Sequence, residues 1–152
     1  MTALINNLQT AFEGEPWFGR SVRDILSEID AETAMKKPAG NGHSILELVW
    51  HMVTWRQFTI SRLKNSGEDL HEFEANDWRV LDHSNPALWN EGLELLFATQ
   101  KELIQLLSSF DEKRLTEKVE GRQYNYEFLL QGIIQHDIYH LGQVAYVRKF
   151  LS

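Results

Sequence analysis

Apolar residues recur every three or four positions along most of the chain, a spacing that places them on one face of an α-helix. The pattern is interrupted where glycine and proline occur. It predicts helical segments over 2–13, 16 to about 30, 44 to about 65, 86 to about 109 and 125–150. A short glycine and proline break separates the first two segments, so we expect four long amphipathic helices.

Three of these segments have recognisable start signals. Pro16 and Pro86 suit the first turn of a helix, where a missing N–H costs no hydrogen bond, and Asn85 can cap the second of them. Ser44 and Glu47 have the spacing of a capping box, in which each side chain bonds the other residue's backbone N–H. The clearest helix start in the chain is therefore Ser44.

The segments between the helices are polar and rich in turn-forming residues. Residues 31–43 end the first helical region, and residues 67–85 are expected to form a long crossover loop. Residues 111–124 could form a small hairpin. Four helices without a convincing series of strands predict an all-α four-helix bundle in one domain, residues 1–152. An α+β domain built on 111–124 is the alternative.

Composition restricts the possible partners. Fifteen basic and 22 acidic residues give a net charge of -7, and no basic cluster offsets it, so we expect neither nucleic acid nor an anionic membrane surface as a partner. The chain contains no run of 18 apolar residues that would span a bilayer and no signal-like N-terminus, which predicts a cytosolic protein. It contains no cysteine, so a metal ion would have to use His, Asp or Glu.

His136 and His140 are the first candidates for such a site. Residues four apart lie on the same face of a helix, and on that face they neighbour Leu129, Ile133 and Val147. Two imidazoles on an inward face can bind one ion. The alternative is a pair of independent, half-buried histidines that bond carbonyls or water.

His51 strengthens the metal hypothesis, because it lies on the apolar face of the 44–65 helix with Trp55 and Phe58. A ligand from a facing helix is the usual way in which a bundle completes a metal site, and three histidines leave positions open for water or substrate. A hydrogen-bonded core histidine is the alternative. We expect no chemistry from His43, His71 or His83, which fall at a helix start or in loops.

Other polar residues of these faces could support the site. Glu47 lies one turn before His51 and Gln143 one turn after His140, so both are candidates to orient ligands or a bound water from outside the coordination sphere. For Asp137, a solvated carboxylate or a similar supporting role is favoured over that of a catalytic base. Tyr139 and Trp55 could line a pocket mouth or be plain core residues.

These motifs together resemble the DinB/YfiT-like superfamily. The resemblance covers nearly the whole chain and rests mainly on His136-Asp137-Ile138-Tyr139-His140-Leu141-Gly142-Gln143. The spacing from Ser44 to His51 also matches, and Pro16-Trp17-Phe18-Gly19 and Trp55-Arg56 match one branch. The resemblance implies an up-down-down-up bundle whose crossover links the second and third helices. It also implies a metal site on His51, His136 and His140, and a homodimer.

The resemblance does not imply one reaction. Characterised relatives include transferases and isomerases that use low-molecular-weight thiols, and others are labelled metal-dependent hydrolases. Our first hypothesis is a metal-dependent enzyme that transfers such a thiol to a small electrophile. The alternatives are a hydrolase and a non-catalytic, metal-binding stress-response module. Zinc, nickel, iron and copper all suit three imidazoles.

Overall fold

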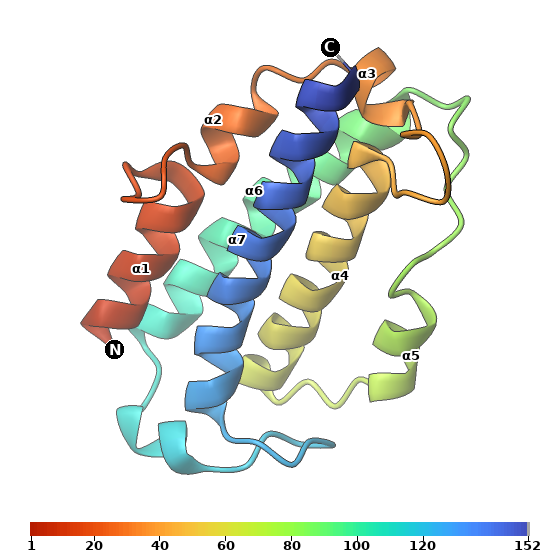
Figure 1. The fold of residues 1–152 in the computed structure, drawn as a ribbon. Coiled ribbons are helices and arrows are strands. Elements are labelled where there is room, and N and C mark those ends of the chain that lie inside the picture. Colours follow the sequence, from red (N-terminus) through yellow and green to blue (C-terminus); the bar gives the residue numbers. More distant parts are fainter. Residues whose placement is uncertain (152) are drawn as a thin grey trace.

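The apolar stripes of the sequence become four long helices (Figure 1). The structure is a computed structural model that describes residues 1–151, and it contains no strand within that range. The long helices are α1 (Thr2–Glu13), α4 (Ile45–Lys64), α6 (Ala87–Ser108) and α7 (Tyr126–Leu151). The prediction of an all-helical fold is confirmed, and residues 1–151 offer no β-structure for the α+β alternative.

The predicted helix from Pro16 is much shorter than expected. Residues 17–20 form a turn in which Gly19 has φ +133°, a value that side-chain-bearing residues rarely adopt. Helix α2 (Val22–Leu26) begins only after this turn, where the Ser21 hydroxyl accepts a hydrogen bond from Asp24 N. The sequence pattern overestimated this helix because the apolar spacing continues through the turn.

Three further short elements lie in segments that were expected to be loops. They are α3 (Ala31–Met35), α5 (Leu70–Ala75) within the crossover, and the 3₁₀ turn η1 (Glu112–Thr116). Each has an aspartate at its N-cap whose carboxylate accepts a backbone N–H. The small hairpin considered within 111–124 is reduced to a turn closed by one antiparallel bridge between Lys118 and Asn125, in which Val119 N donates to Tyr124 O at 2.9 Å, and no strand pair extends from it.

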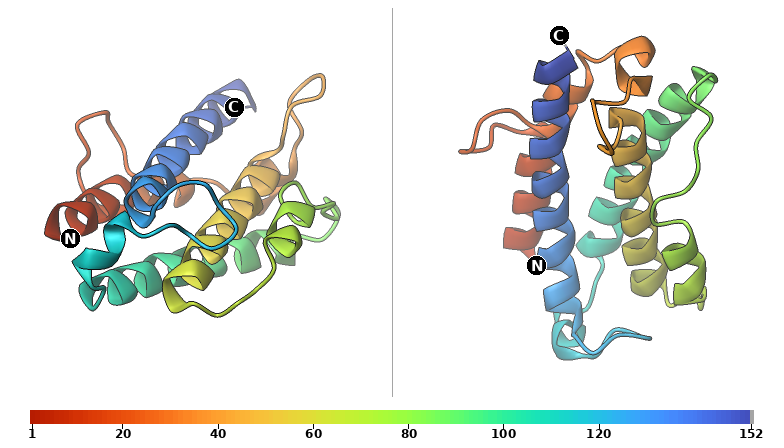
Figure 2. Two further views of the ribbon diagram at one scale, coloured as in Figure 1. Left: turned by 90° about the horizontal axis from the view of Figure 1, so that it is seen from below. Right: turned by 45° about the vertical axis from the view of Figure 1, so that its right-hand side comes forward.

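The most buried element is α4, which explains how its polar residues come to lie inside the protein. It packs against both α6 and α7, and Figure 2 shows it between other elements from two directions. The predicted capping box is confirmed: Ser44 Oγ accepts from Glu47 N at 3.1 Å, and Glu47 Oε2 accepts from Ser44 N at 2.8 Å. This start fixes which residues of α4 face α7.

In Figure 1, α1 and α7 run in one direction while α4 and α6 run in the other. This arrangement supports the up-down-down-up bundle, which we retain as a proposal for the topology. The long connection between α4 and α6 passes along the outside of α4 and carries α5. Within residues 1–151, no helix combines the length and hydropathy needed to cross a membrane.

Candidate metal centre

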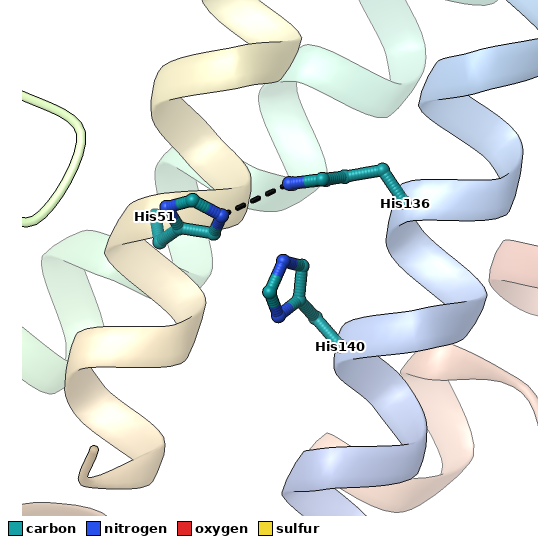
Figure 3. A group of neighbouring side chains, drawn as sticks. All are labelled: His51, His136 and His140. Atoms are coloured by element: carbon teal, nitrogen blue, oxygen red, sulfur yellow. Dashed lines mark hydrogen bonds between the residues drawn. The ribbon is translucent and has the colours of Figure 1, made fainter. Parts of the chain in front are cut away.

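The three histidines predicted from the sequence converge between α4 and α7 (Figure 3). His51 extends from α4, and His136 and His140 extend from successive turns of α7. One nitrogen of each ring lies within 4.8 Å of the others, and His51 Nε2 is 3.0 Å from His136 Nε2. His51 and His140 are buried, and His136 is partly buried. The three rings therefore form one cluster rather than three separate core histidines.

His51 is oriented by the crossover. Its Nδ1 lies 3.0 Å from the backbone oxygen of Asp77 and 2.9 Å from that residue's carboxylate Oδ1. Both atoms can only accept, so the proton of a neutral His51 belongs on Nδ1 and the lone pair on Nε2. The same Oδ1 accepts a hydrogen bond of 2.6 Å from Trp55 Nε1, which holds the carboxylate in place. A carboxylate therefore accepts the N–H of a histidine whose other nitrogen is free to bind a metal ion, an arrangement that accompanies many metal sites.

Gln143 does the same for His140. Its Oε1 lies 2.6 Å from His140 Nδ1 and can only accept a hydrogen bond, so His140 Nε2 is left without a proton. In Figure 3 this second nitrogen points toward the gap between His51 and His136. The supporting position expected for Gln143 agrees with this contact.

His136 is less constrained. Because His51 Nε2 presents a lone pair, the 3.0 Å contact needs His136 Nε2 to donate. His136 Nδ1 is buried and has no hydrogen-bond partner among the described residues. An ion that bound Nε2 of both rings would replace the proton that now lies between them.

Burial keeps the cluster uncharged. Burial, together with the neighbouring histidines, lowers the pKa of His136 to about 3 and that of His140 to about 4. Burial also lowers the pKa of His51, although Asp77 opposes this shift. All three rings are therefore neutral at pH 7, which is the form that binds a metal ion.

The ring of Trp78 covers His51. The two rings stack with centroids 3.9 Å apart and planes 5° from parallel, and His43 stacks on the other side of Trp78 at 3.7 Å. Two hydrogen bonds on either side of Trp78 in the chain attach the crossover to α4. Arg79 donates to Thr54 Oγ1 at 2.9 Å, and Thr54 donates to the backbone oxygen of Asn76 at 3.2 Å. The sequence analysis missed Asp77 and Trp78, and it gave His43 no role.

Asp137 is neither solvated nor in contact with the histidines. It is 2% exposed, and its Oδ2 accepts hydrogen bonds from Arg56 Nε at 3.0 Å and from Arg56 Nη2 at 2.6 Å. Arg56 is fully buried and also donates to Gln100 on α6. Burial raises the pKa of Asp137, while the guanidinium opposes this shift. The predicted solvated carboxylate is therefore wrong: Asp137 joins α7 to α4 beside His136.

Glu47 does not reach the cluster. Its carboxylate bonds Ser44 N and Lys37 Nζ, each at 2.8 Å, and approaches His43 at 3.7 Å. Among the described residues, Glu47 makes no contact with His51. Its capping role accounts for its position, and no contact supports the predicted role of orienting a ligand. His83 bonds Ser44 Oγ at 2.9 Å, and His71 is exposed. Neither belongs to the cluster.

The donor set fits a divalent metal ion. Imidazole nitrogens bind zinc and similar ions at about 2.0–2.2 Å, which places two ligands of a tetrahedral ion roughly 3.4 Å apart. The 3.0 Å separation of His51 and His136 is close to this value, and the nitrogen of His140 lies within 4.8 Å of the other two. Three histidines leave at least one coordination position for an exogenous ligand.

Comparison with known families decides which group of proteins this is. The model of the DinB superfamily matches residues 18–144, which include all three histidines. The chain belongs to the DinB superfamily. No curated protein and no solved structure matches it.

Two pockets of this DinB-superfamily protein border α7 on either side of the histidines. One, of about 150 Å³, includes His136 and Trp55 in its wall. The other, of about 610 Å³, includes His43, Tyr139 and Gln143. Trp55 and Tyr139 thus line pockets on opposite sides of the cluster. The arrangement offers space for two organic groups, one on each side of the ion site.

Proposed function

We propose that the protein is a metal-dependent enzyme that transfers a low-molecular-weight thiol to a small electrophile. The observation that carries this proposal is the position of three neutral imidazoles between two pockets. Membership of the DinB superfamily supports the metal site, and the pockets support a reaction with two organic reactants. We also propose that His51, His136 and His140 are the ligands.

A divalent ion lowers the pKa of a thiol or water bound to it and thereby supplies a nucleophile at neutral pH. The protein's own groups prepare the site for this ion. Asp77 and Gln143 fix the protons of His51 and His140 on Nδ1. Trp78 covers the ring of His51 and excludes water from that side.

The two pockets favour group transfer over hydrolysis. Hydrolysis brings one organic molecule to the ion together with water, so it needs one pocket. Transfer of a thiol to an electrophile brings two organic molecules together, and holding both near the reacting atoms removes much of the entropic barrier. The pocket at His136 and the pocket at Gln143 open on the two sides of the cluster, as such a reaction requires.

Elemental analysis and kinetics test this proposal. Protein purified without an affinity tag should contain about one divalent ion per chain, and His136→Ala protein should contain none. The loaded protein should accelerate the reaction in which the sulfur of glutathione or cysteine displaces chloride from 1-chloro-2,4-dinitrobenzene or bromide from monobromobimane, with release of the halide and the thiol proton. The rate should saturate in both reactants and vanish with chelator.

Other outcomes of these experiments would support one of the two alternative functions. Metal-dependent ester or amide hydrolysis without a thiol requirement would identify a hydrolase. Cobalt-substituted protein whose absorption spectrum shows closed four-coordination, unchanged by thiols, would indicate a non-catalytic metal-binding module. Absence of any bound metal would contradict the whole proposal.

A further inference from the structure

The pocket beside His136 has an apolar, mainly aromatic wall. It lies between α4 and α7 and is bordered by residues one turn before the histidine. The side chains that give it this character are Trp55, Phe58, Tyr124, Phe128, Leu129 and Ile133. We propose that this pocket binds the uncharged, apolar part of a small-molecule substrate, a flat group about the size of a benzene ring. The inference rests on the proposed function for the position of the reacting atom, but the pocket itself does not depend on a metal.

Most polar groups of the wall are already bonded elsewhere; the exception is His136, whose Nδ1 has no hydrogen-bond partner among the described residues. Trp55 Nε1 donates to Asp77 at 2.6 Å, and Thr59 Oγ1 donates to the backbone oxygen of Trp55 at 2.9 Å. Burial raises the pKa of Tyr124, so its phenol stays neutral. No Asp, Glu, Lys or Arg of the described chain lines the pocket. An anionic ligand group would therefore lose its hydration without gaining a hydrogen-bond donor, since the ring proton of His136 lies on Nε2.

Two cations lie near this wall, and both have other partners. The guanidinium carbon of Arg62 is 4.7 Å from the ring centre of Phe58, and its Nη1 donates to the backbone oxygen of Glu68 at 2.9 Å. The guanidinium carbon of Arg122 is 5.3 Å from the ring centre of Phe58 and 5.7 Å from that of Trp55. Its Nη1 is 3.7 Å from Glu74 Oε1. The positive charges are thus placed over ring faces and beside other acceptors, and they do not make the pocket a site for anions.

The volume indicates the size of the ligand group. An apolar cavity of about 150 Å³ lined by aliphatic and aromatic side chains is large enough to bind benzene, and this pocket has a volume of about 150 Å³. Aromatic rings in the wall favour a flat partner that packs edge to face or in an offset stack. The pocket ends at His136, so such a group would extend toward the proposed ion site.

Two glycines of α7 allow a matched test. Gly132 lines the small pocket and Gly142 lines the larger one on the other side of the histidines. A Cβ at either position would meet no atom within 4 Å, so a larger side chain can be accommodated at both. Gly132→Leu should occupy the small pocket, whereas Gly142→Leu adds the same side chain to the same helix without touching it.

Toluene is the probe, and benzoate is the charged control with the same ring. Ligand-observed NMR titrations with chelator-treated protein should show saturable toluene binding and at least tenfold weaker binding of benzoate. Gly132→Leu should weaken toluene binding at least tenfold, while Gly142→Leu should change it less than twofold. Phe128→Ala, which removes an exposed wall ring, should weaken it as well.

Each alternative result overturns the proposal. Equal effects of the two glycine substitutions would place toluene elsewhere, and tighter binding of benzoate would show that Arg122 makes an anion site. Absence of saturable toluene binding would also contradict the proposal. Because the titration uses chelator-treated protein, its outcome does not depend on an ion, and metal analysis of the untreated protein tests the metal site separately.

Discussion

Asp77 and Gln143 each accept a hydrogen bond from Nδ1 of a site histidine, which turns the Nε2 lone pairs of His51 and His140 toward the cluster. The two partners come from different parts of the chain. Gln143 is three residues from His140 on the same helix, so its proximity could be predicted from helical spacing. Asp77 is brought to His51 by the crossover, whose path no local pattern encodes.

Loss of the Asp77 carboxylate should weaken metal binding. Asp77→Ala removes the acceptor at 2.9 Å but leaves the backbone carbonyl at 3.0 Å. We expect an affinity loss of about 10-fold to 100-fold, as is usual when such an orienting carboxylate is removed. Isothermal titration with zinc measures it. Asp82→Ala, in the exposed part of the crossover, is the matched control, and an equal loss there would refute the role of Asp77.

Replacement of a ligand should have a larger effect. His136→Ala or His140→Ala leaves two imidazoles and should reduce metal affinity below detection in the same titration. His71→Ala removes an exposed histidine of α5 and should leave affinity unchanged. Equal losses for the two classes of variant would contradict the assignment of the site.

Acid should destabilise the metal-free protein through these rings. The pKa of His136 is about 3 in the folded protein, whereas an unfolded histidine has a pKa near 6.5. The folded-state pKa is depressed, so this contribution to stability is fully present above pH 6.5 and is lost as the pH falls toward 3. For His136 the loss at pH 5 is at most about 2 kcal/mol.

Urea unfolding of chelator-treated protein at pH 7.5 and pH 5 measures this dependence. His136→Gln should reduce the difference between the two pH values, because the titrating ring is gone. His71→Gln should preserve it. A difference that is the same in all three proteins would show that other groups cause the acid sensitivity.

At the scale of the helices, the buried pair Arg56 and Asp137 connects the two elements that carry the ligands. Asp137 adjoins His136, and Arg56 lies on α4 together with His51. The pair is bidentate on the arginine side, and the 0% and 2% exposure of its members excludes solvent. It therefore fixes how α7 lies against α4, and with it the distance between His51 and His136.

Breaking the Arg56–Asp137 pair should lower the free energy of unfolding. Asp137→Ala leaves a buried guanidinium without its carboxylate, and we expect a loss of about 3–5 kcal/mol in the free energy of unfolding. The double replacement Arg56→Met with Asp137→Leu removes both charges and should recover most of that loss. Urea denaturation measures both variants. Lys36→Ala, at an exposed ion pair with Glu32, should leave the midpoint unchanged.

The four long helices and the three clustered histidines could be predicted because helical periodicity is a local property. His136 and His140 share a face by their spacing alone, and His51 was placed by the apolar stripe of α4. The short helices α3 and α5 carry too few turns to give a periodic signal. The partnership of Arg56 with Asp137 spans 81 residues, so it depends on how two helices pack and not on either sequence segment.

For the molecule as a whole, the core and the metal site are separable. The two hydrophobic clusters contain residues of several helices and do not need an ion to pack. We expect the chelated protein to remain folded, with a melting temperature lower by roughly 5–10 °C than at a metal concentration 100 times the Kd. Far-UV circular dichroism with and without chelator checks this. Collapse of the helical signal on chelation would show that the ion is primarily structural.

His51 and His136 are separated by 85 residues, and this spacing affects the protein during synthesis. The helix that carries His51 leaves the ribosome long before α7, and domains of growing chains begin to fold from the N-terminal side. A chain interrupted before α7 has one of the three imidazoles and retains an ion no better than any isolated histidine. If the proposed ion binds, retention of metal marks molecules whose last helix has docked, and binding stabilises only those molecules.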